Sequence, residues 1–198
     1  MSKRRKWDIR TGRTVYDNPW INVREYQAVA PTGADALYGL VHMKRLALGV
    51  LPIDSDGSIL LVGQERFPFG SWSWELPEGG GGHDDPPILT AQRELAEECG
   101  LKAAGWAELM RDVHLSNSVT DERAWGYLAW DLSPETGFAP DASEDLEIMR
   151  VPFAEAVRMA VSGGITDVIS LVMLLKADHL ARTGSLPEPV ARLLLGGG

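Results

Sequence analysis

The sequence has a single cysteine, Cys99, among its 198 residues. One cysteine excludes an internal disulfide framework and a zinc site built from cysteines. Long hydrophobic runs are also missing. The most apolar segments, Leu46–Ile53 and Val168–Leu175, are far shorter than the roughly 18 residues that a membrane-spanning helix needs. The basic start of the chain leads into polar residues and not into the apolar part of a signal peptide, so we expect a cytoplasmic protein without a membrane segment.

Basic residues are scarce, since 19 Lys and Arg stand against 28 Asp and Glu, which gives a net charge of −9. Such a chain repels nucleic acid, and we expect no nucleic-acid partner. Four of the basic residues are gathered at positions 3–6, where a solvated terminus explains them. The apolar share of 44% is that of an ordinary globular domain. For an anionic substrate, the protein's own carboxylates must first be neutralised, and a divalent cation is the obvious candidate.

Hydrophobic patterning predicts an α/β protein. Alternation before residue 45 predicts a small antiparallel sheet, and the region after it predicts a second hairpin at Ala47–Ile53 and Ile59–Gln64. The order of the elements favours an α/β/α sandwich with a mixed sheet over residues 45–198, preceded by a β-subdomain over residues 1–44. The other strands are expected at Thr14–Tyr16, Ile21–Ala30, Ala36–His42, Ala124–Asp131 and Leu146–Val151, and helices at Pro87–Cys99, Pro152–Val161, Thr166–Arg182 and Pro187–Leu195.

The helix expected over Pro87–Cys99 carries three glutamates on one face. At about 100° per residue, Glu98 lies at about +40° and Glu97 at about −60° from Glu94. Arg93, four residues before Glu97, is placed to pair with it and fix its rotamer. Like charges at this spacing repel unless a cation lies over them, and Mg²⁺ prefers such oxygen ligands. An adjacent apolar stripe should anchor the helix; it consists of Ile88, Ala91, Leu95 and Cys99.

The segment around this helix resembles the Nudix box. That pattern is a Gly, five residues, a Glu, seven residues and then R-E-U-x-E-E-x-G-U, where U is apolar. Gly79, Asp85 and the run Arg93–Leu101 reproduce its spacing, and eight of its nine fixed positions match. The departure is Asp85, where the family usually has Glu. The resemblance implies an α/β/α sandwich and the hydrolysis of a nucleoside diphosphate linked to another group.

The same resemblance implies a metal site. Glu94 and Glu98 would ligate Mg²⁺, with Mn²⁺ as the alternative ion. Glu97 would ligate the ion or orient the reactants, and so counts as catalytic as well. The backbone carbonyl of Gly79, or that of Glu78, would join these ligands. The glycine-rich stretch that contains Gly79 is expected to form a loop.

Features outside the box resemble the ADP-ribose and nucleoside-diphosphate-sugar pyrophosphatases. These features are the N-terminal β-subdomain, the W-E-L-P-x-G segment at Trp74–Gly79, and an acidic loop, strand, helix, G-x-I-x-D turn and final helix after residue 142. They imply cleavage of an ADP-ribose-like nucleoside diphosphate sugar to a nucleoside monophosphate and a sugar phosphate. They also imply a homodimer paired through residues 1–44.

This second resemblance suggests residues for substrate binding. Arg66 would contact a substrate phosphate, although a surface charge at a strand end would explain it equally well. Trp72 could stack on a base, whereas Trp74 is more typical of packing. Glu122 matches the acidic end of a substrate-loop motif, in which Ser116–Ser118 replaces the group's Ser-Pro-Gly start.

The general base of the ADP-ribose group comes from an acidic loop that resembles residues 141–145 of this chain. Glu144 matches best, and Asp141 and Asp145 are alternatives. His83 lies in the glycine-rich segment, where a solvated side chain is expected rather than a ligand. Cys99 lies on the apolar stripe and is expected to be buried and inert.

Two other functions are open to such a chain. One is the hydrolysis of modified nucleoside triphosphates or dinucleoside polyphosphates, against which the long N-terminal sheet argues. The other is a non-catalytic module that senses nucleotide sugars. Modules of that kind usually lose glutamates of the box, and here Glu94, Glu97 and Glu98 are all present.

Overall fold

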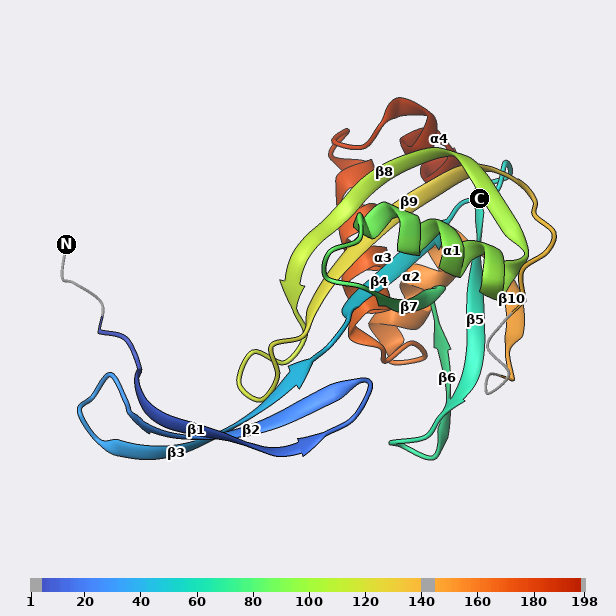
Figure 1. Cartoon of the computed structure of the whole chain (residues 1–198). Coiled ribbons are helices and arrows are strands. Elements are labelled where there is room, and N and C mark those ends of the chain that lie inside the picture. Colours follow the sequence, from blue (N-terminus) through green and yellow to red (C-terminus); the bar gives the residue numbers. More distant parts are fainter. Residues whose placement is uncertain (1–4, 140–144, 197–198) are drawn as a thin grey trace.

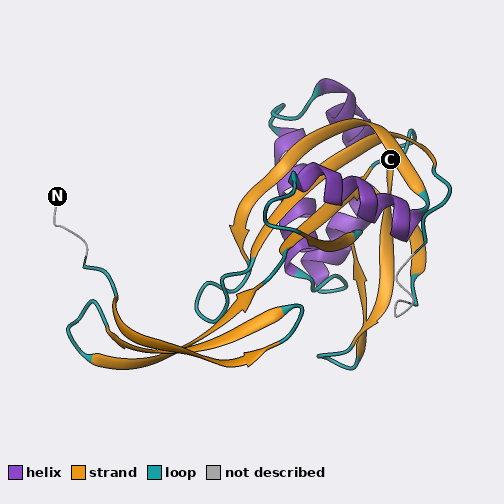
Figure 2. Cartoon of the chain, in the orientation of Figure 1, coloured by secondary structure: helices purple, strands orange, loops and turns teal. Residues whose placement is uncertain are grey.

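A computed structural model describes residues 5–139 and 145–196. A three-stranded sheet at the N-terminus projects from a larger part in which strands and helices are combined (Figures 1 and 2). The two parts meet near residue 45, where the first strand of the larger part begins. None of the helices within the described ranges is both long and apolar enough to cross a membrane.

The N-terminal sheet is antiparallel, as the sequence predicts, and its strand order is β1-β2-β3. Its strands are β1 (Asp8–Asp17), β2 (Ile21–Val29) and β3 (Asp35–Met43). Strand β1 starts well before the predicted Thr14. The prediction missed this start because every residue of the strand is exposed and its sequence shows no apolar alternation. Both faces of this sheet therefore lie largely outside the core.

The central sheet has the order β7-β4-β9-β8. Strand β4 (Leu46–Pro52) runs parallel to β9 (Arg123–Pro134) and antiparallel to β7 (Glu78–Gly81), while β8 (Leu101–His114) pairs with β9 in the antiparallel sense. The mixed sheet that the sequence predicts is thus present. A further sheet, in the order β10-β5-β6, consists of β5 (Ser58–Arg66), β6 (Ser71–Glu75) and β10 (Glu147–Pro152).

Helices cover both faces of the central sheet, so the expected α/β/α sandwich is confirmed. On one face, Leu48 of β4 packs with Leu95 of α1 (Pro87–Cys99). On the other, Gly49 admits α3 (Val168–Arg182), because a Cβ at this position would stand 2.7 Å from Ile169 Cγ2. The remaining helices are α2 (Phe153–Ser162) and α4 (Glu188–Gly196).

Several local predictions fail, and strand β6 is also absent from the predicted elements. Strands β4 and β5 do not form the predicted hairpin: they belong to different sheets and share only the isolated bridge of Ile53 with Ile59. The glycines 79–81 belong to strand β7 instead of a loop; Glu94 and Thr90 of α1 occupy the space that side chains at Gly79 and Gly81 would need. Strand β8 is unexpected, since two register shifts interrupt its alternation.

Candidate functional site

Helix α1 is held in place by its predicted apolar stripe, which the structure confirms. Ala91 and Leu95 are completely buried, and Ile88 and Cys99 pack against the same cluster. The helix ends at Gly100, which adopts a left-handed conformation with φ of 64°. This anchoring turns the neighbouring glutamate face toward strand β7.

Two of the three glutamates are removed from solvent. Glu94 is 7% exposed and Glu98 is 5% exposed, whereas Glu97 is more open. Arg93 forms ion pairs with Glu94 and with Glu97, and the second of these is the predicted pairing. Arg93 Nη2 also donates to the Gly80 carbonyl at 3.1 Å, which ties this arginine to β7.

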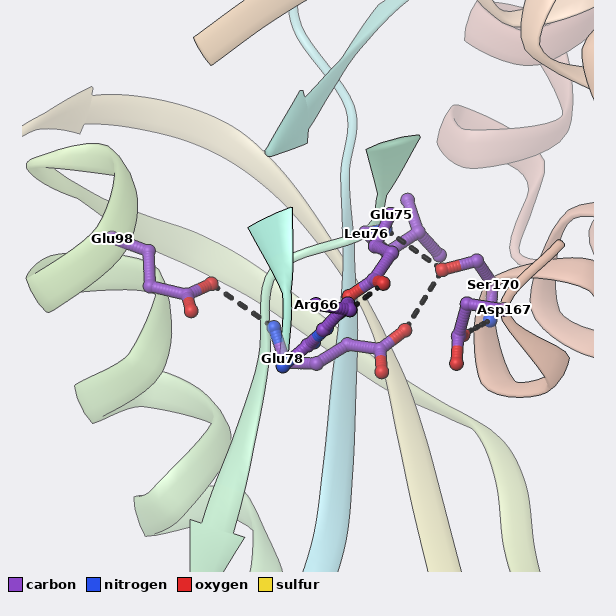
Figure 3. Close-up of polar contacts among 7 residues, drawn as sticks. All are labelled: Arg66, Glu75, Leu76, Glu78, Glu98, Asp167 and Ser170. Atoms are coloured by element: carbon purple, nitrogen blue, oxygen red, sulfur yellow. Dashed lines mark hydrogen bonds and ion pairs between the residues drawn. The ribbon is translucent and has the colours of Figure 1, made fainter. Parts of the chain in front are cut away.

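The backbone of β7 lies directly against the two buried carboxylates. A side chain at Gly79 would overlap the carboxylate of Glu94, so the glycine provides the space in which that group sits. The N–H of Glu78 donates to Glu98 Oε2 at 3.0 Å (Figure 3). The expected metal ligands, two carboxylates and the backbone at Glu78–Gly79, are therefore brought together.

A cavity of about 280 Å³ opens beside these groups. Its lining combines two arginines with carboxylates and backbone: Arg45, Gly79, Gly80, Arg93, Glu94, Glu97 and Ala139. Within residues 5–139 and 145–196, no three carboxylate, imidazole or thiol side chains are grouped closely enough to cage an ion by themselves. The donors that are present are hard oxygen atoms, which suit Mg²⁺ sharing its coordination with backbone, water and phosphate. The arginines suit phosphate oxygens.

A second cavity, of about 490 Å³, brings together Arg66 and Trp72. Arg66 Nε donates to both carboxylate oxygens of Glu75 at 3.0 Å, and this pairing raises the pKa of Arg66. Arg66 is thus an oriented cation with 38% of its side chain exposed, while Glu75 is buried beneath it. Trp72 packs edge-on against Trp74, with ring centroids 5.7 Å apart.

The second cavity also contains Asp167, at the N-terminus of α3. Desolvation, the Asp167 charge and a hydrogen bond with Asp167 raise the pKa of Glu78 well above its ordinary value. Desolvation and the charges of Asp167 and Asp121 raise the pKa of Glu122. The side chain of Glu78 points toward Asp167 while its backbone faces Glu98, so this residue lies between the two groups (Figure 3). Because the charge of Asp167 acts on Glu122, Glu122 lies within electrostatic reach of the second cavity.

The segment that replaces the Ser-Pro-Gly motif contacts the N-terminal sheet. The Tyr38 hydroxyl donates to the Ser118 carbonyl at 2.6 Å, and His42 Nδ1 lies 2.5 Å from Asp121 Oδ2. The N–H of Met43 donates to Asp121 Oδ1 at 2.8 Å. The segment that precedes Glu122 is therefore fixed to strand β3.

The remaining sequence candidates lie elsewhere. Glu144 and Asp141 fall outside the described residues, and Asp145 is exposed just before β10. His83 is exposed, with Nε2 3.1 Å from the Met43 carbonyl. Burial, with a contribution from Glu98, raises the pKa of the Cys99 thiol to about 12.

Sequence reasoning missed four polar residues that line or support these cavities. Arg45 carries no motif signal. Glu75 and Asp167 stand in the W-E-L-P-x-G and G-x-I-x-D segments, but nothing in the spacing shows that the two residues line one cavity. Ser170 looks like part of an apolar helix and is fully buried.

Comparisons with known proteins agree with this architecture. The NUDIX domain family matches residues 43–168. An ADP-ribose pyrophosphatase of Mycobacterium tuberculosis (strain ATCC 25618 / H37Rv) is 37% identical over 152 residues, which cover 73% of this chain and 70% of that protein. A CMP-5'-(N-acetyl-N-hydroxy-3-aminopropyl)phosphonate hydrolase of Streptomyces rubellomurinus (strain ATCC 31215) is 28% identical over 158 residues, covering 80% and 75%. A crystal structure of an ADP compounds hydrolase superposes with a TM-score of 0.81 at 21% identity, covering 94% of this chain and 100% of that one, and shows the shared fold.

Proposed function

The chain belongs to the Nudix family, and on this premise we propose that it hydrolyses the pyrophosphate bond of an ADP-ribose-like nucleoside diphosphate sugar. The products are a nucleoside monophosphate and a sugar phosphate. One observation carries the proposal: the buried carboxylates of Glu94 and Glu98 lie against the backbone of β7, beside a cavity that Arg45 and Arg93 also line. Two relatives named ADP-ribose pyrophosphatase support this choice of substrate.

The cation of this site is Mg²⁺ in our proposal, with Mn²⁺ able to replace it. Glu94, Glu97 and Glu98 would hold it together with the backbone carbonyl of Gly79, or that of Glu78. When bound, such an ion neutralises phosphoryl charge and lowers the pKa of water. The chain's own contribution is orientation, because Arg93 holds Glu94 and Glu97 through ion pairs.

In this proposal, different parts of the substrate bind in the two cavities. Arg45 and Arg93 line the first cavity, where their guanidinium groups bind diphosphate oxygens. Arg66 in the second cavity contacts a substrate phosphate from the position that Glu75 imposes on it. Trp72 offers an exposed ring on which a base can stack.

Water attack requires a group that accepts a proton. We assign this role to Glu144, with Asp141 and Asp145 as the alternatives in the same acidic segment. As the oxygen of water bonds to one phosphorus, the bridging P–O bond breaks and the carboxylate takes the proton. Glu97 orients the reactants, and Glu122, held beside β3, binds the substrate.

We further propose that residues 1–44 form the interface of a homodimer, while residues 45–198 form the hydrolase domain. A three-stranded sheet needs a hydrophobic face or a packing partner to be stable. The N-terminal sheet exposes large apolar side chains and has a groove of about 400 Å³ lined mainly by apolar groups. A second copy would cover both. The exposed side chains are Trp7, Ile9, Val15, Tyr16, Trp20 and Leu37.

No other partner is required by this proposal. A net charge of −9 disfavours nucleic acid, and the substrate is a small nucleotide. We place the enzyme in the cytoplasm, since its one cysteine needs no oxidising compartment.

A substrate panel tests the function. ADP-ribose, ADP-glucose, GDP-mannose and UDP-glucose are incubated with the protein in excess Mg²⁺, and products are separated by ion-exchange chromatography. We expect AMP and ribose 5-phosphate from ADP-ribose, and no turnover after chelation of the metal. Release of pyrophosphate from triphosphates, with nucleotide sugars left intact, would favour the triphosphatase alternative. Binding of nucleotide sugars without turnover would favour a sensor.

Sedimentation at several protein concentrations tests the dimer. We expect a mass near twice the chain's 21.6 kDa. A monomer at all concentrations would contradict the proposed interface.

A further inference from the structure

Ser170 is a completely buried polar residue in the first turn of α3. Its hydroxyl accepts a hydrogen bond from the N–H of Leu76 at 2.8 Å and donates one to Glu78 Oε1, also at 2.8 Å (Figure 3). Its own N–H donates to Asp167 Oδ2 at 2.7 Å, which caps the helix. One hydroxyl thus joins α3 to the segment that connects β6 and β7.

That segment leads directly to the cation site. Glu78, which receives the Ser170 hydrogen bond on its side chain, donates its backbone N–H to Glu98 Oε2. The next residue is Gly79, whose backbone lies against the Glu94 carboxylate. A displacement of Leu76 or Glu78 would therefore move the surfaces against which both buried carboxylates pack.

Packing alone does not account for the hydroxyl. The neighbours of Ser170 on α3, Ile169, Met173 and Leu174, belong to the apolar core. A hydroxyl in such surroundings is unfavourable unless it forms hydrogen bonds, whereas an alanine would impose no such requirement. The two hydrogen bonds of the Ser170 hydroxyl both end on the Leu76–Glu78 segment, so this polar group serves that segment.

We propose that Ser170 is a positioning residue for the divalent-cation site. Acting through Leu76 and Glu78, it fixes the backbone against which Glu94 and Glu98 are aligned. Asp167 accepts the hydrogen bond from the Ser170 N–H and also lines the second cavity. Ser170 therefore links the cation site to the cavity of Arg66. This inference rests on the proposed function, since it requires a cation at these glutamates.

Cation binding tests the inference without relying on turnover. Mn²⁺ is titrated into the parent protein, Ser170→Ala and Ala177→Gly, and free Mn²⁺ is followed by its electron paramagnetic resonance signal. Ala177 is buried further along the same helix, so Ala177→Gly is a matched control that destabilises α3 and keeps the Ser170 hydroxyl that bonds Leu76 and Glu78. Groups that orient metal ligands typically contribute a factor of about 10 to 100 in affinity, and we expect Ser170→Ala to raise the Mn²⁺ dissociation constant about tenfold.

The control variant is expected to bind Mn²⁺ like the parent, even though its thermal unfolding temperature falls. Equal Mn²⁺ affinity of the parent and Ser170→Ala would overturn the inference and leave the proposed function standing. An equal loss of affinity in Ala177→Gly would also overturn it, because general loosening of α3 would then explain the effect. A parent protein that binds no Mn²⁺ would overturn the proposed function, and the inference with it.

Discussion

Strands β1 and β4 have contrasting surroundings. All ten residues of β1 are exposed, whereas every residue of β4 except Ala47 is buried. Strand β4 is covered by α1 on one face and by α3 on the other, so contacts within the chain determine its position. Strand β1 pairs with β2 along one edge and has no helix over either face.

The contrast suggests different roles for the packed region around β4 and for the exposed N-terminal sheet. A site that aligns charged groups needs rigid neighbours, and Glu94 and Glu98 lie on α1, which is anchored by buried side chains against the packed strand β4. An exposed sheet with apolar side chains is suited to receiving a partner. The ion pairs differ in the same way: Arg13 is exposed and Glu25 is partly exposed, whereas Glu75 is buried under Arg66.

The largest difference between the two regions is expected in catalysis. Glu98→Gln removes a proposed ligand charge while keeping the shape of the side chain. Because outer-shell partners of metal ligands already contribute up to about 100-fold, we expect kcat/KM to fall by more than about 100-fold. Glu25→Gln on β2 is the control and should leave kcat/KM unchanged. If Glu98→Gln and the parent had comparable kcat/KM, the assignment of Glu98 as a metal ligand would be wrong.

The second difference concerns core packing. Leu48 of β4 is 0% exposed, and truncating such a residue costs about 2–5 kcal/mol of folding free energy. Val15 of β1 is exposed in the single chain, so Val15→Ala should stay within about 0.5 kcal/mol in a monomer. Urea unfolding of Leu48→Ala and Val15→Ala measures both. A loss in Val15→Ala that grows with protein concentration would show that a partner covers β1.

The sequence predicted well what depends on local periodicity. The helix over Pro87–Cys99 has the same bounds in the structure, and its apolar stripe faces the core, with Ala91 and Leu95 buried and Ile88 and Cys99 partly buried. Arg93 pairs with Glu97 because the two residues are four apart on this helix. Motif spacing also identified the family, because a box of fixed spacing is a local signal.

The rest depends on residues that are distant in the chain. Gly79 and Gly81 read as a loop because glycine is rare in strands, yet Glu94 and Thr90 of α1 fill the space above them. Ser170 and Glu78 are 92 residues apart, and neither residue type signals their contact. No periodicity in one segment reports which other segment will pack against it.

Breaking matched ion pairs tests the contrast in electrostatics. Glu75→Gln removes the buried partner of Arg66, and hydrogen bonds to charged groups contribute about 1.5–3 kcal/mol. Arg13→Gln removes an exposed pair on the N-terminal sheet, where about 0.2–1 kcal/mol is typical. Urea unfolding at low and high salt should show a larger and less salt-sensitive loss in Glu75→Gln. Equal losses in the two variants would contradict the difference in environment.

The pH dependence of stability gives a smaller effect. Since the pKa of Glu78 is raised in the folded protein, the folded state keeps a proton that the unfolded state loses above about pH 4.5. The contribution of Glu78 is therefore fully present below that pH and is lost as pH rises toward the folded pKa, by at most about 1.4 kcal/mol per pH unit. Glu78→Gln should gain stability relative to the parent as pH increases in metal-free buffer. Parallel curves for the two proteins would refute the shift.

The smallest effect has the opposite sign and lies at the end of β1. A hydrogen bond from Lys44, followed by one from Asn22, lowers the pKa of Asp17. The contribution of Asp17 is thus present above its unfolded pKa of 3.8 and is lost as pH falls through the lower folded value. Asp17→Asn should be slightly less stable than the parent at neutral pH and equal to it in strong acid, as measured by urea unfolding. Since Asp17 is exposed and Glu78 is desolvated, the two substitutions should move the pH profile in opposite directions. A shift in the same direction would mean that the two carboxyl groups share one environment, against the contrast between β1 and the core.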